Sequence, residues 1–192
     1  MAKINRTKYA ILGMLSLEPM SGYDMKKRFD NSVTHFWNEN YGHIYPVLKR
    51  LERDGLVTKR TENTEGKPSK HVYSITEQGK KDLHEWLLLP AERPALRIEL
   101  LLKLFFGHMV PTKNLIQKVE DEKRFCARTL ETFDQIANHI EEIKSKKTLT
   151  GAQYWLITLH YGQRYYRAVQ KWCEETLEIL RKEDETQGAK NE

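Results

Sequence analysis

The residues best suited to chemistry lie between positions 41 and 53, where polar side chains alternate with apolar ones. With Ile44, Leu48 and Leu51 facing a core, the outward candidates are Tyr41, His43, Tyr45, Lys49, Arg50 and Arg53. Aromatic, imidazole and basic groups can donate hydrogen bonds to base edges, contact thymine methyl groups and neutralise phosphates. The same residues could also form an ordinary solvated face with a packed tyrosine, so this pattern favours nucleic-acid binding without proving it.

A second group of cations surrounds Gly66 and Pro68, in a polar stretch between two short apolar segments. These cations are Lys59, Arg60, Lys67 and Lys70. A loop with this composition suits contact with phosphates. Glu62 and Glu65 in the same stretch reduce its positive character.

The net charge of +5 comes from 32 basic and 27 acidic residues among 192. It is concentrated in residues 1–89, which hold 15 Lys and Arg against 11 Asp and Glu, whereas residues 90–192 hold 17 against 16. An excess of this size is compatible with a polyanionic partner but does not demonstrate one.

The first half changes its apolar period several times. Helices are expected over residues 7–17, from 21 onward, over 40–54 and over 76–89, with strands over 56–60 and 71–75. Ser21 with Asp24, Gly55 and Thr76 supply the expected helix caps. Three helices, a hairpin and a fourth helix are the plan of a winged helix-turn-helix, whose third helix enters the major groove while the hairpin approaches the DNA backbone.

The second half predicts two long helices after a proline-containing linker at residues 90–94 and a short apolar helix over 96–106. Apolar residues recur every seven positions in each long helix: Val119, Cys126, Phe133 and Ile140 in the first, and Leu159, Tyr166, Cys173 and Leu180 in the second. An antiparallel hairpin within one chain would explain the pattern. We prefer a hairpin that also packs against a second copy, because each stripe is wider than a two-helix seam requires.

The predicted fold is therefore mainly α with a small β-hairpin. Residues 1–89 form a winged helix-turn-helix domain, 90–94 a linker, 95–183 a helical dimerisation domain and 184–192 a polar tail. The predicted dimer contacts are Val119, Cys126, Phe133, Ile140, Leu159, Tyr166 and Cys173.

The residues do not favour an enzyme. The seven histidines are scattered with no H-x-x-x-H pair, and there is no C-x-x-C, Walker loop or G-x-G-x-x-G. Both cysteines fall on heptad core positions, so we expect no metal site and no cofactor. The apolar run 9–15 is interrupted by Ser16, Glu18 and Pro19 without a cleavage site, which favours a cytoplasmic protein over a secreted one.

Aromatic residues are frequent in the second half and near the linker. Most of them are expected to be core, but a small-molecule pocket is a second interpretation. Its candidate residues are Trp86, Phe106, Gln153, Trp155 and His160.

Several motifs occur together in order and spacing over residues 4–89. They are YAILG at 9–13, SGYD at 21–24, IYPxLxxLxxxGL at 44–56 and YxITxxG at 73–79. Together they resemble the PadR family of bacterial transcriptional regulators. Phe36-Trp37, Leu102-Lys103-x-x-Phe106 and Gln153-Tyr154 resemble its longer subfamily, which includes phenolic-acid-responsive repressors.

The resemblance implies a homodimeric repressor that binds a pseudo-palindromic DNA operator and is released from it by a small aromatic effector. The predicted DNA contacts are Ser21, Tyr23, Tyr41, His43, Tyr45, Lys49, Lys67, Ser69 and Lys70. The wing differs slightly from the family, because Ser69 and His71 stand where basic or aromatic residues are more common. Two other functions stay open: a winged helix that docks proteins, and a multidrug-sensing repressor with a hydrophobic pocket at the dimer centre.

Overall fold

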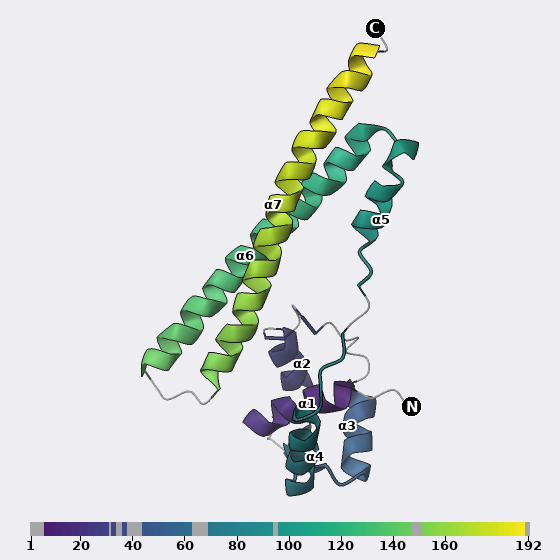
Figure 1. Ribbon diagram of the computed structural model, residues 1–192. Helices are drawn as coiled ribbons and strands as arrows, with labels where there is room; N and C mark the ends of the chain where they lie inside the picture. The colour runs from purple at the N-terminus through teal and green to yellow at the C-terminus, as the bar shows by residue number, and fades with distance from the viewer. Residues whose placement is uncertain are drawn as a thin grey trace. The chain divides into compact units, whose positions relative to one another are not determined.

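A computed structural model describes residues 6–30, 32–33, 36–37, 44–62, 69–93, 96–146 and 151–190. The chain divides into two compact units, residues 1–93 and 94–192 (Figure 1). The division falls inside the proline-containing segment at 90–94. None of the helices in the described ranges is both long and apolar enough to cross a membrane.

The first unit combines four helices with a small antiparallel sheet. The helices are α1 (Arg6–Leu17), α2 (Gly22–Asp30), α3 (Ile44–Arg53) and α4 (Glu77–Leu87), and the strands are β1 (Met20–Ser21), β2 (Val57–Glu62) and β3 (Lys70–Ile75). The strand order is β1-β3-β2. β2 and β3 form the expected wing hairpin, with Val57 opposite Ile75 and Glu62 opposite Lys70. β1 is an additional strand that the sequence did not predict, and it pairs Ser21 with Val72.

The predicted caps are present and explain where these elements begin and end. Gly55 has a φ of +71°, the left-handed conformation that ends α3 and turns the chain into β2. The Thr76 hydroxyl accepts a hydrogen bond from the Gly79 amide at 3.0 Å and donates one to the Gly55 carbonyl at 2.8 Å. This single side chain therefore caps α4 and joins it to the end of α3.

The core of the first unit consists of the apolar faces that the period predicted. Its fully buried members come from α1, α2, α3 and β2 and include Ile11, Leu12, Met25, Leu48, Leu51 and Val57. On its border Tyr9 of α1 stacks on Trp86 of α4, with ring centroids 4.6 Å apart and planes within 6° of parallel. Because the apolar face of α3 packs against α1 in this core, the opposite face of α3 points to solvent.

The second unit is a helical hairpin with a short helix beside it. It contains α5 (Glu99–Phe105), the 3₁₀ turn η2 (Gly107–Met109), α6 (Thr112–Lys146) and α7 (Ala152–Lys190), and α6 and α7 lie antiparallel along their length (Figure 1). α7 continues to Lys190 and includes most of the predicted polar tail, since residues 182–187 are mainly good helix formers with no glycine or proline.

The seven-residue rows lie in the seam between α6 and α7 of one chain. Phe133 is 1% exposed, and its ring packs so closely on Gly162 that a Cβ there would lie 2.6 Å from the ring. Beside it the buried Gln163 amide donates a 2.7 Å hydrogen bond to Asp134. Val119, Cys126, Leu159 and Cys173 are also buried, and Ile140 and Tyr166 are half-buried. The intrachain hairpin therefore already buries five of the seven residues we predicted as dimer contacts and partly covers the other two.

Candidate nucleic-acid interface

Tyr45 stands in the first turn of α3, where it contacts α2 and also remains accessible. A Cβ on Gly22 would lie 2.6 Å from Tyr45 Cε1, so the ring rests directly on the backbone of Gly22. The Tyr45 side chain is nevertheless 60% exposed. Tyr45 is therefore both packed and accessible: one part of its ring rests on α2, and the rest is exposed. Only glycine at position 22 lets the two helices approach this closely.

The outer face of α3 presents three exposed cations that differ in their partners. Arg50 Nε lies 3.6 Å and Arg53 Nε 3.3 Å from the carboxylate of Asp54. Lys49 has no carboxylate within 4.0 Å in the described parts of the chain. Among the described residues Lys49 therefore differs from the two arginines, which share one carboxylate.

α2 contributes a second exposed face that sequence reasoning missed. Tyr23 is exposed, and Lys26 and Lys27 follow it at the helical spacings of three and four residues. Neither lysine has an acidic partner among the described residues. The spacing alone could have placed both lysines beside Tyr23.

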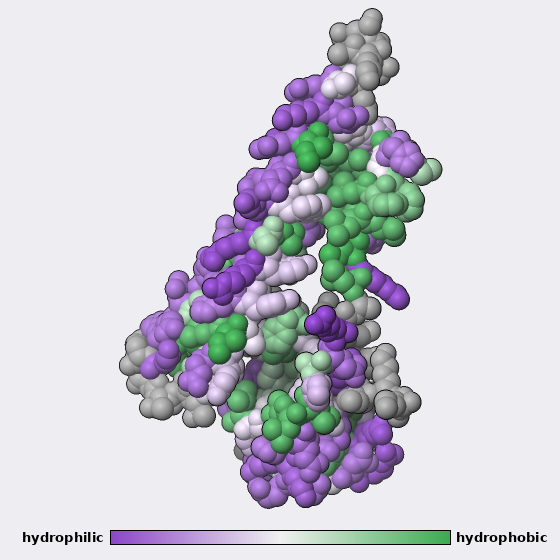
Figure 2. Space-filling view, viewed as in Figure 1, coloured by the Kyte–Doolittle hydropathy of each residue, from purple (hydrophilic) through white to green (hydrophobic). Residues whose placement is uncertain are grey.

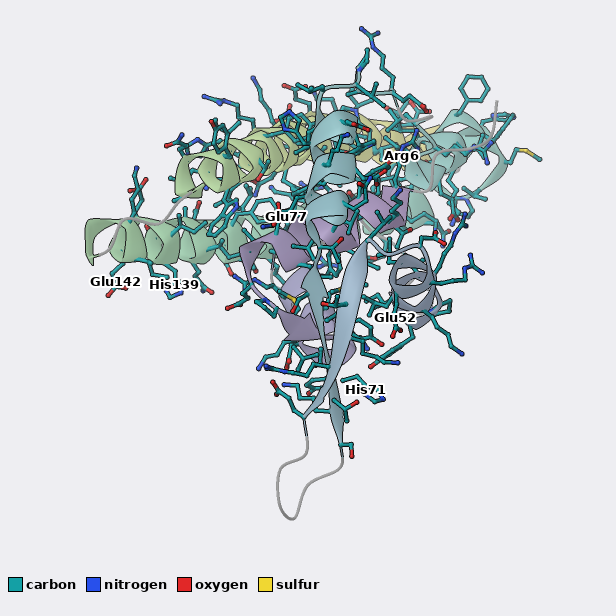
Figure 3. The ribbon with its side chains drawn as sticks, turned by 90° about the horizontal axis from the view of Figure 1, so that it is seen from below. Arg6, Glu52, His71, Glu77, His139 and Glu142 are labelled. Carbon is teal, nitrogen blue, oxygen red and sulfur yellow. The ribbon has the colours of Figure 1, made fainter. Side chains whose placement is uncertain are left out.

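The wing is less cationic than its composition suggested. Figure 3 shows the β2–β3 hairpin extending away from α3, with His71 on the hairpin and Glu52 on α3. Lys59 Nζ lies 3.3 Å from Glu52, and Arg60 pairs with Glu62 on the same strand. The Thr61 hydroxyl lies 3.2 Å from His71 Nδ1 across the hairpin. Two of the predicted phosphate cations thus already have carboxylate partners.

Ser21 and Lys70 have intrachain partners that revise the roles predicted for them. Ser21 is only 5% exposed, and its hydroxyl donates to Asp24 Oδ2 at 2.8 Å while accepting from the Asp24 amide at 3.2 Å. Ser21 is therefore a helix cap, since a buried hydroxyl with two partners has no free access to DNA. Lys70 Nζ lies 2.7 Å from the same Asp24 oxygen.

The remaining predicted contacts are placed as follows. Ser69 is exposed immediately before β3. Tyr41, His43 and Lys67 lie outside the described residues. The exposed surface formed by Tyr23, Lys26, Lys27, Tyr45 and Lys49 is called the α2–α3 face below.

The predicted effector residues fall in both units. Trp86 belongs to the first unit, where Tyr9 covers one side of its ring. In the second unit Phe106 is exposed and contacts Phe105 edge to face, with centroids 5.0 Å apart. Gln153 and His160 are exposed on α7. Trp155, which lies between them in the sequence, is half-buried. In the described parts of the chain no three His, Cys, Asp or Glu side chains are grouped to hold a metal ion.

Family comparisons match both units. Residues 11–85 match the model of the transcriptional regulator PadR-like family, and residues 96–181 match the model named virulence activator alpha C-term. Each match lies within one of the two units.

Two curated proteins are similar to part of the chain. The negative transcriptional regulator PadR of Bacillus subtilis is 39% identical over 100 residues, which are 52% of this chain and 55% of that protein. The probable transcriptional regulator Rv1176c of Mycobacterium tuberculosis is 35% identical over 82 residues, 43% of each. The aligned region therefore spans about half the length of these relatives.

Solved structures extend the similarity to nearly the whole chain. The structure of smu.1604c from Streptococcus mutans is 34% identical, with a TM-score of 0.75 over 88% of this chain and 97% of that one. Bacillus subtilis PadR with operator DNA is 26% identical, with a TM-score of 0.79 over 93% and 99%, and PadR with p-coumaric acid has a TM-score of 0.70 over 90% and 97% at the same identity. The predicted fold class is confirmed, and the chain belongs to the PadR family of transcriptional regulators.

Proposed function

We propose that this regulator binds operator DNA through the α2–α3 face and represses transcription. The observation that carries the proposal is the exposed pair Tyr45 and Lys49 on α3, held outward by the buried Ile44, Leu48 and Leu51. α3 would enter the major groove while Lys26 and Lys27 on α2 contact the flanking phosphates. The similarity to PadR solved with operator DNA supports this arrangement.

Lys49→Ala is expected to weaken DNA binding and to lower its salt dependence. The binding partner would be a duplex that the wild-type chain selects from a random-sequence pool, compared with a scrambled duplex of equal composition. Loss of one phosphate contact should weaken binding to both duplexes and reduce the slope of log affinity against log salt by about 1. Fluorescence anisotropy at several salt concentrations measures both quantities.

The matched control is Lys81→Ala on α4 of the same unit, which removes an exposed lysine that has no acidic partner among the described residues. It should leave the affinity and the slope close to wild type. Equal effects of the two substitutions would mean that net charge, and not the α2–α3 face, determines binding. If the wild-type chain enriches no sequence, the DNA proposal fails and a protein-docking winged helix becomes the better explanation.

We also propose that the regulator is a homodimer whose contact surface includes α5. None of the α5 residues is buried in the single chain. Around α5 the exposed apolar residues are Leu96, Leu101, Leu102, Phe105, Phe106, Met109 and Val110, and Figure 2 shows hydrophobic side chains gathered over this helix. A contiguous apolar patch of this kind marks an interaction site. A second copy would bury it and would provide two α3 helices for a two-fold operator.

A small aromatic acid is the effector class that we propose for release from the operator. The similarity to PadR solved with p-coumaric acid supports this class, and Gln153, Trp155 and His160 on α7 are candidate contacts. A ligand weakens DNA binding only as far as it prefers the conformation that does not bind DNA, and a preference of about 3 kcal/mol would weaken binding roughly 150-fold.

p-Coumaric acid is therefore expected to quench tryptophan fluorescence and to release the selected duplex over the same concentration range. Trp155→Phe should remove most of the quenching, whereas Trp37→Phe in the first unit should keep it. Quenching without release at saturating ligand would contradict effector control, since binding would then not be coupled to DNA affinity.

A further inference from the structure

The carboxylate of Asp24 joins two elements of the DNA-binding unit. Its Oδ2 atom accepts a hydrogen bond from the Ser21 hydroxyl at 2.8 Å and lies 2.7 Å from Lys70 Nζ. Asp24 belongs to the first turn of α2, and Lys70 is the first residue of β3. One oxygen atom therefore connects the helix pair that presents the α2–α3 face with the hairpin that forms the wing.

The contact between Asp24 and Lys70 lies beyond the end of the backbone pairing between β1 and β3. β1 contains only two residues, and its pairing with β3 ends at Ser21 opposite Val72. Lys70 lies two residues before Val72, at the start of β3, where its backbone is opposite Glu62 of β2 in the wing hairpin. At this end of β3 the side chains of Asp24 and Lys70 supply the connection to α2.

A carboxylate beside a DNA-binding surface requires an explanation, because it repels phosphates. Lys70 and Ser21 lower the pKa of Asp24, and Asp24 in turn raises the pKa of Lys70, so both groups are charged at neutral pH. The negative position of Asp24 in the first turn of α2 also suits the helix dipole. The pair is neutral as a whole, so Lys70 brings little free positive charge to the wing.

We propose that Asp24 is a positioning residue whose ion pair with Lys70 fixes the wing relative to α2 and α3. This inference rests on the proposed function, because the fixed spacing matters only if both parts contact one DNA duplex. Lys70 then acts on DNA binding mainly through the position of the wing rather than as a phosphate contact. The pairing is lost as the pH falls through the lowered pKa of Asp24, below the ordinary value of about 3.9, and on the alkaline side as the pH rises through the raised pKa of Lys70.

The sign of one substitution separates positioning from simple electrostatics. Asp24→Asn removes a negative charge yet keeps a side chain that can bond to Ser21. Removal of that charge alone should strengthen binding to any duplex, whereas loss of the connection should weaken binding to the selected duplex about fivefold, the size expected for a partly exposed ion pair. Binding to the scrambled duplex should change less than twofold, since non-specific binding needs no fixed spacing.

The control is Asp30→Asn at the other end of α2, where the carboxylate is exposed and has no cationic partner among the described residues. It should strengthen binding to both duplexes slightly or leave it unchanged. Lys70→Arg should keep the wild-type affinity, and the double variant Asp24→Asn with Lys70→Met should bind no more weakly than either single variant. Stronger binding by Asp24→Asn, or additive losses in the double variant, would overturn the proposal.

Hydrogen exchange without DNA gives an independent result. Asp24→Asn should speed the exchange of the amides at residues 70–72, and Asp30→Asn should not. Unchanged exchange at these amides would also overturn the proposal. If exchange responds but the wild-type chain selects no duplex, the connection is real and the proposed function is what fails.

Discussion

Replacing Gly79 with alanine is expected to destabilise the first unit by about 3 kcal/mol, the upper part of the usual range for overpacking. A Cβ at this position would lie 2.2 Å from the Leu56 carbonyl oxygen and 2.9 Å from the Ile75 side chain. The backbone oxygen cannot move aside without displacing the start of β2, which carries the wing. Peptide-resolved hydrogen exchange on the full chain should show exchange in the first unit more than a hundredfold faster, with the second unit unchanged.

Gly13→Ala is the matched control, because Gly13 also lies in a helix of the first unit and a Cβ there meets nothing within 4 Å. Alanine is the better helix former, so this variant should be equal to wild type or more stable by about 0.5–1 kcal/mol. If Gly79→Ala exchanged like Gly13→Ala, the close approach of α4 to Leu56 would be wrong.

Phe133→Ala is expected to destabilise the second unit by about 3–5 kcal/mol. Its ring is buried against Gly162 and contacts Tyr166 edge to face, with centroids 5.7 Å apart. Because both neighbours belong to α7 of the same chain, the loss should appear as faster exchange along α6 and α7 at any protein concentration. The first unit should keep its wild-type exchange.

Phe105→Glu provides the comparison, because Phe105 is 78% exposed on α5 and outside the seam. If α5 forms the dimer contact, this charge should convert a dimer into a monomer in sedimentation while the α6–α7 hairpin stays folded. If the Phe105→Glu variant still sedimented as a dimer, α5 would not be part of the dimer interface. If Phe133→Ala instead yielded folded monomers with normal exchange, Phe133 would belong to a contact between chains.

The elements that depend on local pattern could be predicted. The period of α1 placed its helix at 7–17, one residue from its observed start, and Gly55 and Thr76 marked the caps of α3 and α4. These signals are local, because apolar spacing, caps and turn residues act within a few residues. The heptad rows were also placed correctly on α6 and α7. Their partner chain could not be known, since a repeat shows which residues meet a helix and not which chain supplies it.

Contacts between distant segments could not be predicted from any periodic signal. β1 is too short to show alternation, and it exists because β3, some fifty residues later, pairs with it. Ser21 was correctly placed as a cap, but its burial depends on that pairing. The partners of Lys59 and Lys70 lie on α3 and α2, so the wing looked more cationic in the sequence than it is in the fold.

The two buried thiols provide a chemical probe of how readily the α6–α7 seam opens. Burial raises the pKa of Cys126 to about 11 and also raises the pKa of Cys173. At pH 7 only about one Cys126 in ten thousand is then ionised, and alkylating agents and peroxides react with the thiolate. Both sulfur atoms should stay unmodified in the folded hairpin and react once it opens. The rate at which iodoacetamide labels the native protein would therefore report on the opening of the α6–α7 seam.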